Sequence, residues 1–225
     1  MIDASHVRIF RRFLNLAEND SGSPETDYGA VYVYRDGSGG RRQVTLGRGF
    51  TDDGGNLKKV VARYLDRGGE WTALFASRLD KFGQGVLAED HEFISALKKA
   101  AVEPAMQAAQ DEVFNEVYLN PALQWADLHG FHEVLSAGVI VDSFLHSGSM
   151  LGWLMEKFPD RKPCDGGDER HWIAAYCTAR LRWFERATGA LHTCQFRPQF
   201  FLDQIGKGNW DLACPLVVKG KGTIC

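Results

Sequence analysis

The sequence lacks several features that mark particular classes of protein. No apolar run reaches the roughly 18 residues that a membrane-spanning helix needs, so we expect no membrane insertion. A formal net charge of −3 gives no basic excess, so an attraction to nucleic acid is not supported. The N-terminal residues lack the order typical of a signal peptide, which leaves open a removed leader, a leaderless export route and an intracellular location.

Cysteine is scarce, and no two cysteines form a C-x-x-C pair. The histidines likewise have no matched acidic residue at metal-binding spacing, so we expect no metal and no other cofactor. The odd number of cysteines leaves at least one unpaired within the chain. One or two disulfides in the C-terminal part and free thiols both remain open. All five lie in the last third of the chain: Cys164, Cys177, Cys194, Cys214 and Cys225.

The first third of the chain predicts a helix followed by a small sheet. Apolar residues recur at helical spacing over residues 4–17, which predicts an amphipathic helix that ends at Glu18. Residues 19–27 are rich in Ser, Gly, Asp and Pro and predict a loop. Residues 30–35 and 42–47 alternate in polarity around turn-forming residues, which predicts a β-hairpin.

Helical patterns dominate the chain after Phe50. Pro121 begins a segment of apolar residues that predicts a long, buried central helix to about Val141. The fold class is therefore α+β, mainly helical, with a small antiparallel hairpin sheet. The remaining predicted helices cover residues 56–65, 71–82, 90–101, 104–118, 149–158, 168–188 and 197–205, before an extended tail.

Two carboxylic residues in different environments indicate the chemistry of a glycoside hydrolase. Glu18 ends an apolar helix, where burial would keep its carboxyl protonated and suited to a general acid. Asp36 lies in a glycine-rich turn, where solvent and backbone amides favour a carboxylate that acts as general base. Thr45, in the returning strand, would hold the attacking water. Other acids compete with Asp36 for its role: Asp20, Glu25, Asp27, Asp52 and Asp53.

Short motifs spread over most of the chain resemble, in order, those of the glycoside hydrolase family 46 chitosanases of the lysozyme-like superfamily. The strand after Asp36 also resembles the phage-type lysozymes, in which a Thr-x-Gly-x-Gly stretch follows the catalytic acids. The family 46 motifs are Ala17-Glu18-Asn19, Asp36-Gly37, Gly49-Phe50, Gln110-Asp111, Val117-Tyr118-Leu119-Asn120-Pro121-Ala122, Val141-Asp142, His146-Ser147-Gly148, Gly166-Gly167-Asp168-Glu169, Ala179-Arg180, Phe201-Leu202 and Gly208-Asn209-Trp210-Asp211-Leu212.

The resemblance implies a two-lobed, lysozyme-like catalytic domain over residues 1–225. Its minor lobe covers about 19–66 with the hairpin lining a substrate cleft, and helices form the major lobe. Both relatives invert the anomeric centre, so the catalytic carboxyl groups are expected about 6.5 to 9.5 Å apart. The resemblance also implies a charge network behind the acid, formed by Asp142 and Arg180. Gln199 aligns with the family's third, basic member, and Arg197 is the nearest substitute.

One departure from the family bears on the substrate. Chitosanases place an aspartate at the start of the helix after the hairpin, to pair with the amine of glucosamine, whereas this chain has Asn56. An amide cannot neutralise an ammonium but bonds readily to an N-acetyl group. This favours peptidoglycan over chitosan as the polysaccharide partner. Arg48 would meet substrate carboxylates, and Tyr34 is one of several aromatic residues that would stack on a sugar.

We therefore predict an inverting endo-glycosidase that cleaves β-1,4-linked amino-sugar polymers, with peptidoglycan favoured over chitosan. Such a muramidase would act on the cell wall outside the cytoplasm, as a secreted enzyme, an endolysin or an antibacterial effector delivered to the periplasm. For an effector, an immunity or inhibitor protein is an expected partner. The alternatives are a chitosanase, a lytic transglycosylase, and a noncatalytic glycan-binding or inhibitor-binding module.

Overall fold

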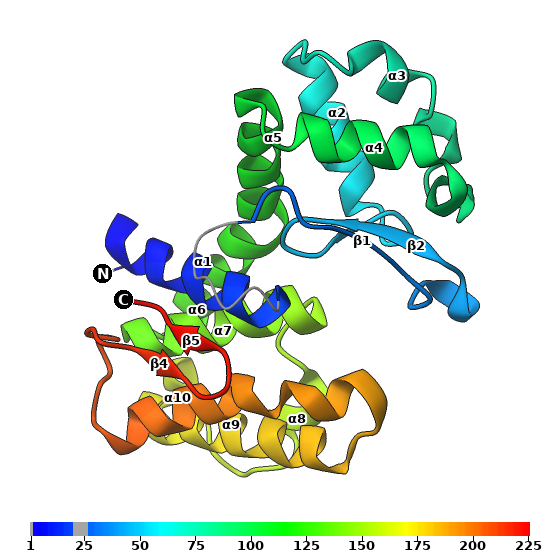
Figure 1. Ribbon diagram of the computed structural model, residues 1–225. Coiled ribbons are helices and arrows are strands. Elements are labelled where there is room, and N and C mark those ends of the chain that lie inside the picture. The colour runs from blue at the N-terminus through cyan, green and yellow to red at the C-terminus, as the bar shows by residue number, and fades with distance from the viewer. Residues whose placement is uncertain (1, 20–26) are drawn as a thin grey trace. The chain divides into compact units, whose positions relative to one another are not determined.

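The computed structural model describes residues 2–19 and 27–225 of the chain. It divides into two compact units, one formed by Thr26–Glu116 and the other by Met1–Glu25 together with Val117–Cys225 (Figure 1). Most of the loop predicted at 19–27, including Asp20 and Glu25, lies outside the described residues. We describe each unit by itself.

The first unit, Thr26–Glu116, contains the predicted hairpin, extended by a third strand. Strands β1 (Val31–Tyr34), β2 (Gln43–Leu46) and β3 (Phe50–Thr51) form an antiparallel sheet in that order. Tyr32 is opposite Thr45, and Thr45 is opposite Thr51. The turn between β2 and β3 needs glycine at Gly47, whose φ is +56° and whose missing Cβ would lie 2.2 Å from a side-chain oxygen of Gln110.

Four α-helices belong to the described part of this unit, and aromatic residues between them form part of its core. Phe75 makes edge-to-face contacts with both Tyr64 and Phe93, at 5.4 Å and 5.5 Å between ring centroids. Pro104 is the first residue of its helix, a position that suits proline because an N–H there would have no partner within the helix. The helices are α2 (Asn56–Asp66), α3 (Thr72–Ala76), α4 (His91–Ala100) and α5 (Pro104–Phe114).

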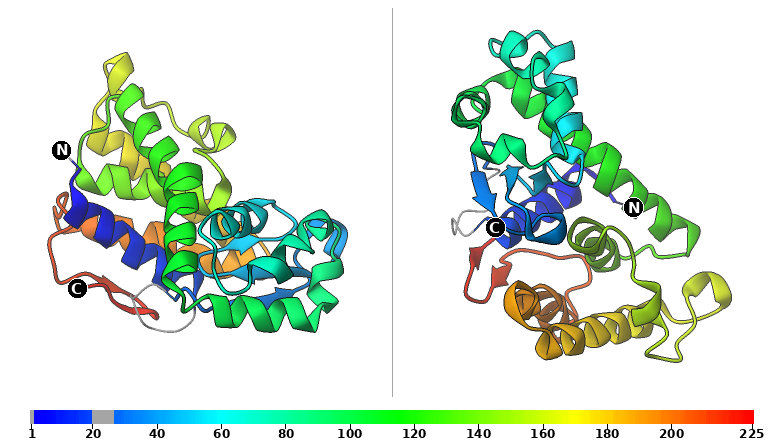
Figure 2. Two further views of the ribbon diagram at one scale, coloured as in Figure 1. Left: turned by 90° about the horizontal axis from the view of Figure 1, so that it is seen from above. Right: turned by 90° about the vertical axis from the view of Figure 1, so that its right-hand side faces the viewer.

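The second unit is a group of helices around one buried helix. Residues Val134 to Ser143 of α7 (Val134–Ser147) are all buried, and α7 packs against α1 (Ala4–Glu18), α6 (Asn120–Leu128) and α9 (Glu169–Arg186). Figure 2 shows α7 within this unit from two further sides. Two more α-helices and a pair of strands belong to this unit: α8 (Gly152–Met155), α10 (Phe196–Gly206), β4 (Val217–Val218) and β5 (Gly222–Thr223).

The α+β fold class predicted from the sequence is confirmed, and three of the predicted helices are corrected. The helix predicted over 149–158 is only the four-residue α8. The long helix predicted from Pro121 is two helices, because α6 ends at Leu128 and Gly130 adopts a left-handed φ of +78°. The helix predicted over 71–82 is short, since α3 ends at Ala76 and is followed by turns. In the last two cases the sequence keeps helical periodicity while the backbone bends, so periodicity alone overestimates the length.

The unit that contains the hairpin continues to Glu116, beyond the minor lobe of about 19–66 that the family resemblance implies. The reason is that α5 packs closely against α2, and ion pairs join these helices on their exposed sides. Arg63 of α2 contacts both Glu112 and Glu116, each at 3.1 Å. Contacts between residues distant in sequence therefore determine where the unit ends.

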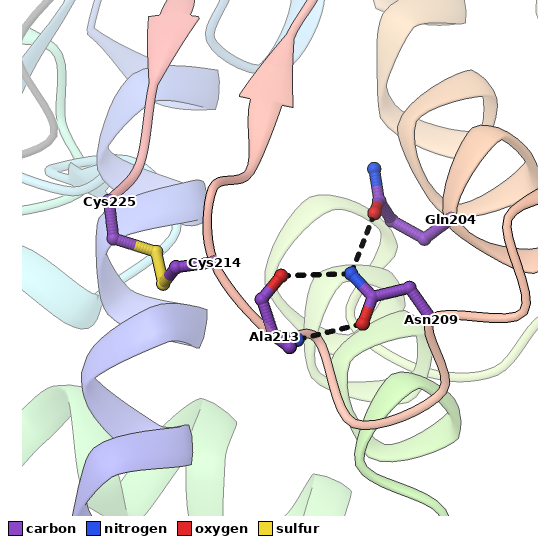
Figure 3. Close-up of a disulfide and its surroundings, with 5 residues drawn as sticks. All are labelled: Gln204, Asn209, Ala213, Cys214 and Cys225. Carbon is purple, nitrogen blue, oxygen red and sulfur yellow. Dashed lines mark hydrogen bonds between the residues drawn. A yellow bond between two sulfur atoms is a disulfide. The ribbon is translucent and has the colours of Figure 1, made fainter.

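One disulfide joins Cys214 to Cys225 in the second unit, with 5.7 Å between the two Cα atoms (Figure 3). Beside it, the Asn209 side chain bonds both the amide and the carbonyl of Ala213, at 2.9 Å and 3.0 Å. Of the described cysteines, Cys164, Cys177 and Cys194 are free thiols. The sequence left open whether the C-terminal cysteines form disulfides, and the structure has one disulfide and three free thiols.

Among the helices of the described ranges, none is long and apolar enough to cross a membrane.

Candidate active site

Glu18 lies at the C-terminal end of α1, where local interactions determine its position. Asp3 caps the start of this helix by accepting hydrogen bonds from the amides of Ser5 and His6, at 2.8 Å and 3.1 Å. At the other end, the buried Asn19 side chain donates to that of Asn15 at 2.8 Å. The helix therefore ends with Glu18 at the protein surface, its side chain 26% exposed.

A chain of ion pairs leads from Glu18 into the core of the second unit. Arg197 of α10 binds the Glu18 carboxyl through Nη2 and one oxygen of Asp142 through Nη1. The other oxygen of Asp142, on α7, accepts from Nη1 of Arg180 on α9. Asp142, Arg180 and Arg197 are almost completely buried. We call Glu18, Arg197, Asp142 and Arg180 the acid-support network.

Charge within the acid-support network is balanced, with two guanidinium groups against two carboxyl groups. Burial alone would raise the pKa of Asp142, but Arg180 and Arg197 together bring this pKa below its usual value. Burial would likewise lower the pKa of Arg197, and the charges of Glu18 and Asp142 raise it instead. The charged state of each buried group is therefore stabilised by its partners. The ion pairs join four helices, α1, α7, α9 and α10.

His146 of α7 lies beside this network. Burial, reinforced by the positive charges of Arg197 and Arg180, lowers the pKa of His146 to about 3 although Asp142 acts in the opposite direction. Its ring packs edge-on against Phe184, with 5.3 Å between the ring centroids. His146 is therefore neutral at ordinary pH and adds no charge to the network.

The predicted base, Asp36, and the predicted water-holding residue, Thr45, lie in the hairpin unit. Asp36 is exposed, and one of its carboxylate oxygens accepts a hydrogen bond from Nε2 of Gln43 at 3.0 Å. Thr45, half-buried in the middle strand, belongs to the strand that supplies Gln43. This arrangement keeps the Asp36 carboxylate in contact with solvent, as a general base requires.

The acids that compete with Asp36 have other partners in the structure. Asp52 is buried and accepts the amide of Gly83 at 2.9 Å, and burial raises the pKa of its carboxyl. Asp53 binds Arg41 at 2.7 Å and also accepts the amide of Ser38. Asp27 accepts the amide of Gly29 at 3.1 Å. These contacts favour Asp36 among the described candidates.

The three predicted substrate-binding residues also lie in the hairpin unit, in different settings. Tyr34 is 56% exposed and stacks on Tyr32, with 5.6 Å between centroids, so its ring is accessible to a sugar. Asn56 is the first residue of α2 and is half-buried. Arg48 is only 1% exposed and binds Asp111 at 2.6 Å. This burial favours a structural role for Arg48, and its contact with substrate stays a prediction.

The structure thus gathers Glu18, Asp142 and Arg180 in one unit, and the five hairpin-side residues belong to the other unit. Arg197 is the central residue of the network, although the sequence comparison offered it only as a substitute for Gln199. Gln199 instead donates to Asp203 at 2.7 Å. In the sequence, the one sign of this role was that Arg197 is a basic residue only two positions before Gln199. The structure shows that the side chain of Arg197, and not that of Gln199, reaches Glu18.

Comparison with known proteins identifies the family of this chain. The family model described as glycosyl hydrolase family 46 matches residues 12–216. The chain belongs to glycosyl hydrolase family 46. The family 46 resemblance predicted from the sequence is therefore confirmed, and the lysozyme-like superfamily fits the fold.

Individual relatives of this family 46 chain are chitosanases. A chitosanase of Bacillus subtilis (strain 168) is 28% identical over 180 residues, which cover 72% of this chain and 61% of the relative. The native chitosanase of Bacillus subtilis MY002 has the same fold, with a TM-score of 0.85, 22% identity, and coverage of 99% of this chain and 98% of that one. The family 46 chitosanase of Gynuella sunshinyii in complex with chitotetraose gives identical values.

Removing the charge of Asp142 tests the stability of the acid-support network. We expect Asp142→Asn to lower the free energy of unfolding by about 3 to 5 kcal/mol, because two buried guanidinium groups lose their shared partner. Denaturant unfolding followed by circular dichroism measures this change. The matched control is Glu89→Gln, which removes an exposed partner of Arg42 and should change stability by less than about 1 kcal/mol. Equal effects of the two substitutions would contradict the analysis.

His146 predicts a pH dependence of stability. Its pKa is about 3 in the folded protein and about 6.5 in the unfolded chain, so the unfolded chain binds the proton first as pH falls. The contribution of neutral His146 is complete above about pH 6.5 and is lost between there and about pH 3, by at most about 1.4 kcal/mol per pH unit. His146→Gln should flatten the stability profile across this range, whereas the exposed His91→Gln should leave it unchanged. A profile that stays equally steep in His146→Gln would refute this assignment.

Proposed function

We propose that this protein is an inverting endo-glycosidase that hydrolyses chitosan, with Glu18 as general acid and Asp36 as general base. The observation that carries the proposal is the acid-support network, which ends on Glu18. A buried charge network costs stability unless every member is paired, so one that leads to a half-exposed carboxyl suggests a functional constraint. Membership of family 46 supports hydrolysis of a glycosidic bond by this carboxyl.

The roles of the residues follow from the chemistry of inversion. As the general acid, Glu18 donates a proton to the bridging oxygen while the glycosidic bond breaks, and Arg197 orients the carboxyl for this transfer. Asp36 accepts a proton from the attacking water, and Thr45 holds that water through its hydroxyl. Arg197, Asp142 and Arg180 are positioning residues, because they act through Glu18 and do not touch the substrate.

Chitosan is favoured over peptidoglycan by the relatives. The curated relative is a chitosanase, and one structural neighbour is a glutamate-to-alanine variant of the Bacillus subtilis MY002 chitosanase in complex with six glucosamine units. None of the relatives named above is a muramidase, so the preference for peptidoglycan derived from Asn56 has no support from them. We accordingly propose an extracellular polysaccharide as the substrate.

One observation still favours an N-acetylated substrate as a second candidate. By the sequence resemblance, Asn56 stands where family 46 chitosanases place an amine-binding aspartate. Neighbouring acids have other partners, since Asp52 is buried and Asp53 binds Arg41. An amide at this position would tolerate N-acetyl groups. We therefore keep peptidoglycan, or a partly acetylated chitosan, as the alternative substrate, and a cell-wall role with it.

The catalytic assignment predicts that Glu18→Gln and Asp36→Asn each lower kcat on chitosan by about a hundredfold or more, as loss of a general acid or base does. Reducing-end assays measure this loss, with the exposed Glu185→Gln as the matched control that retains activity. Proton NMR of the first products should show the α-anomer, because a β-linkage is inverted. A β-anomer would show retention, and full activity of Glu18→Gln would refute catalysis by this site.

The substrate assignment predicts release of reducing ends from deacetylated chitosan in preference to purified sacculi. Asn56→Asp should lower KM for fully deacetylated chitosan about threefold to tenfold, because a carboxylate can pair with the glucosamine amine. The same substitution should not improve activity on highly acetylated chitosan, which serves as the control. Release from sacculi alone would overturn the chitosan proposal and favour a muramidase.

A further inference from the structure

A cavity lies in the helical unit, and no member of the acid-support network lines it. Its volume is about 510 Å³, within the range of about 300 to 1,000 Å³ that small-molecule sites occupy. One wall is a face of α9 that carries Ala175, Thr178, Ala179, Arg182, Trp183 and Arg186. The opposite wall comes from α8 and the residues after it, Trp153, Leu154, Lys157 and Phe158. We call this the α8–α9 pocket.

The α8–α9 pocket and the acid-support network use different faces of α9. Arg180 and its neighbours Cys177 and Phe184 are buried in the core, whereas the pocket-lining positions recur at helical spacing on the other side. Neither Glu18 nor Arg197 lines the pocket. A ligand in this pocket would therefore occupy a site separate from the catalytic one.

Aromatic contacts hold the pocket walls in place. Trp153, 43% exposed, meets Trp183 edge to face with 5.3 Å between centroids, and Trp183 in turn stacks on the buried Phe184 at 4.7 Å. Phe158 makes an edge contact with the buried Trp172 at 5.4 Å. Trp153 packs on the half-buried Trp183, and Trp183 and Phe158 each pack on a buried ring, so the pocket walls are held in place without a ligand.

The charged side chains that line the pocket are all positive. Lys157, Arg182 and Arg186 line it, and among the residues that the structure describes no acidic side chain lines it or pairs with these three. Glu156 and Glu185, their neighbours in sequence, are not part of the lining. All three side chains are exposed beside the apolar lining, and together they attract an anion.

The interior offers little to a neutral polar ligand. Thr178 carries the one neutral hydroxyl of the lining, and this hydroxyl already donates to the carbonyl of Ala174 at 2.8 Å. The other uncharged lining groups are apolar, apart from the indole N–H groups of Trp153 and Trp183. A sugar would leave most of its hydroxyls unpaired here, and a glucosamine polymer would also be repelled by the cations.

We propose that the α8–α9 pocket binds a small organic anion with an apolar body, such as a medium-chain carboxylate. The apolar part occupies the space between Trp153 and the small residues Ala175 and Ala179. The carboxylate is held by the guanidinium groups of Arg182 and Arg186, whose planar donors fit a carboxylate. This site does not depend on the proposed glycosidase activity.

Isothermal titration calorimetry of the full chain with octanoate tests the proposal. We expect octanoate to bind at least about tenfold more tightly than its neutral analogue octanamide, and octyltrimethylammonium not to bind. Affinity for octanoate should fall as salt rises, because screening weakens the ion pairs. Equal binding of octanoate and octanamide, or preferential binding of an acidic peptide such as oligoglutamate, would overturn the proposal.

Substitutions of pocket-lining residues test whether octanoate binds in the α8–α9 pocket. Arg182→Gln combined with Arg186→Gln should weaken octanoate binding about tenfold, whereas the double change of the exposed Arg8 and Arg161 to Gln removes the same charge and should have little effect. Ala175→Leu fills the pocket while keeping all charges and should abolish binding, with folding checked by circular dichroism. Glu18→Gln should bind octanoate like the parent protein even where hydrolysis is lost. Parent-like affinity in both pocket variants, or equal weakening in the control, would refute the site.

Discussion

The buried ion pair between Asp142 and Arg197 is the interaction on which the candidate catalytic acid depends. It joins α7, the most buried helix of its unit, to α10, and Arg197 extends from it to Glu18 at the end of α1. Arg180 binds the other oxygen of Asp142, so each buried charged group contacts a group of opposite sign. Such a network is expensive to bury, and its orientation toward a partly exposed carboxyl connects the helical core to chemistry at the surface.

The two carboxyl groups proposed for catalysis are placed by different kinds of structure. Glu18 is held by tertiary ion pairs within a helical unit, whereas Asp36 is held by the turn of a hairpin and by Gln43 from the next strand. Glu18 is partly buried and paired with an arginine, whereas Asp36 is exposed to solvent. Assigning different proton-transfer roles to two carboxyl groups requires such a contrast in their surroundings. The hairpin residues Asp52 and Asp53 support the turn region and are themselves occupied by backbone and arginine contacts.

Departures from the expected site have physical explanations. Arg48 seemed suited to a substrate carboxylate, yet its guanidinium is enclosed between Asp111 and the ring of Phe114, with 4.7 Å from the guanidinium carbon to the ring centroid. Arginine in a hairpin is usually exposed, so the sequence carried no sign of this burial. Arg197 shows the reverse case, because a residue with no distinctive motif becomes the central member of the network. The α8–α9 pocket was not recognisable from sequence either, since its lining joins two segments about twenty residues apart.

The sequence by itself determined the helical end at Glu18, the hairpin with Asp36 and Thr45, the α+β class, and the likeness to family 46. These features depend on local periodicity, turn residues and short motifs, which act over a few neighbouring positions. Only the tertiary structure decided that α6 and α7 are separate helices, that Cys214 pairs with Cys225, and that Arg197 rather than Gln199 reaches Glu18. Each of these depends on which distant residues pack together in the folded chain, and that packing is not encoded in any single stretch of sequence.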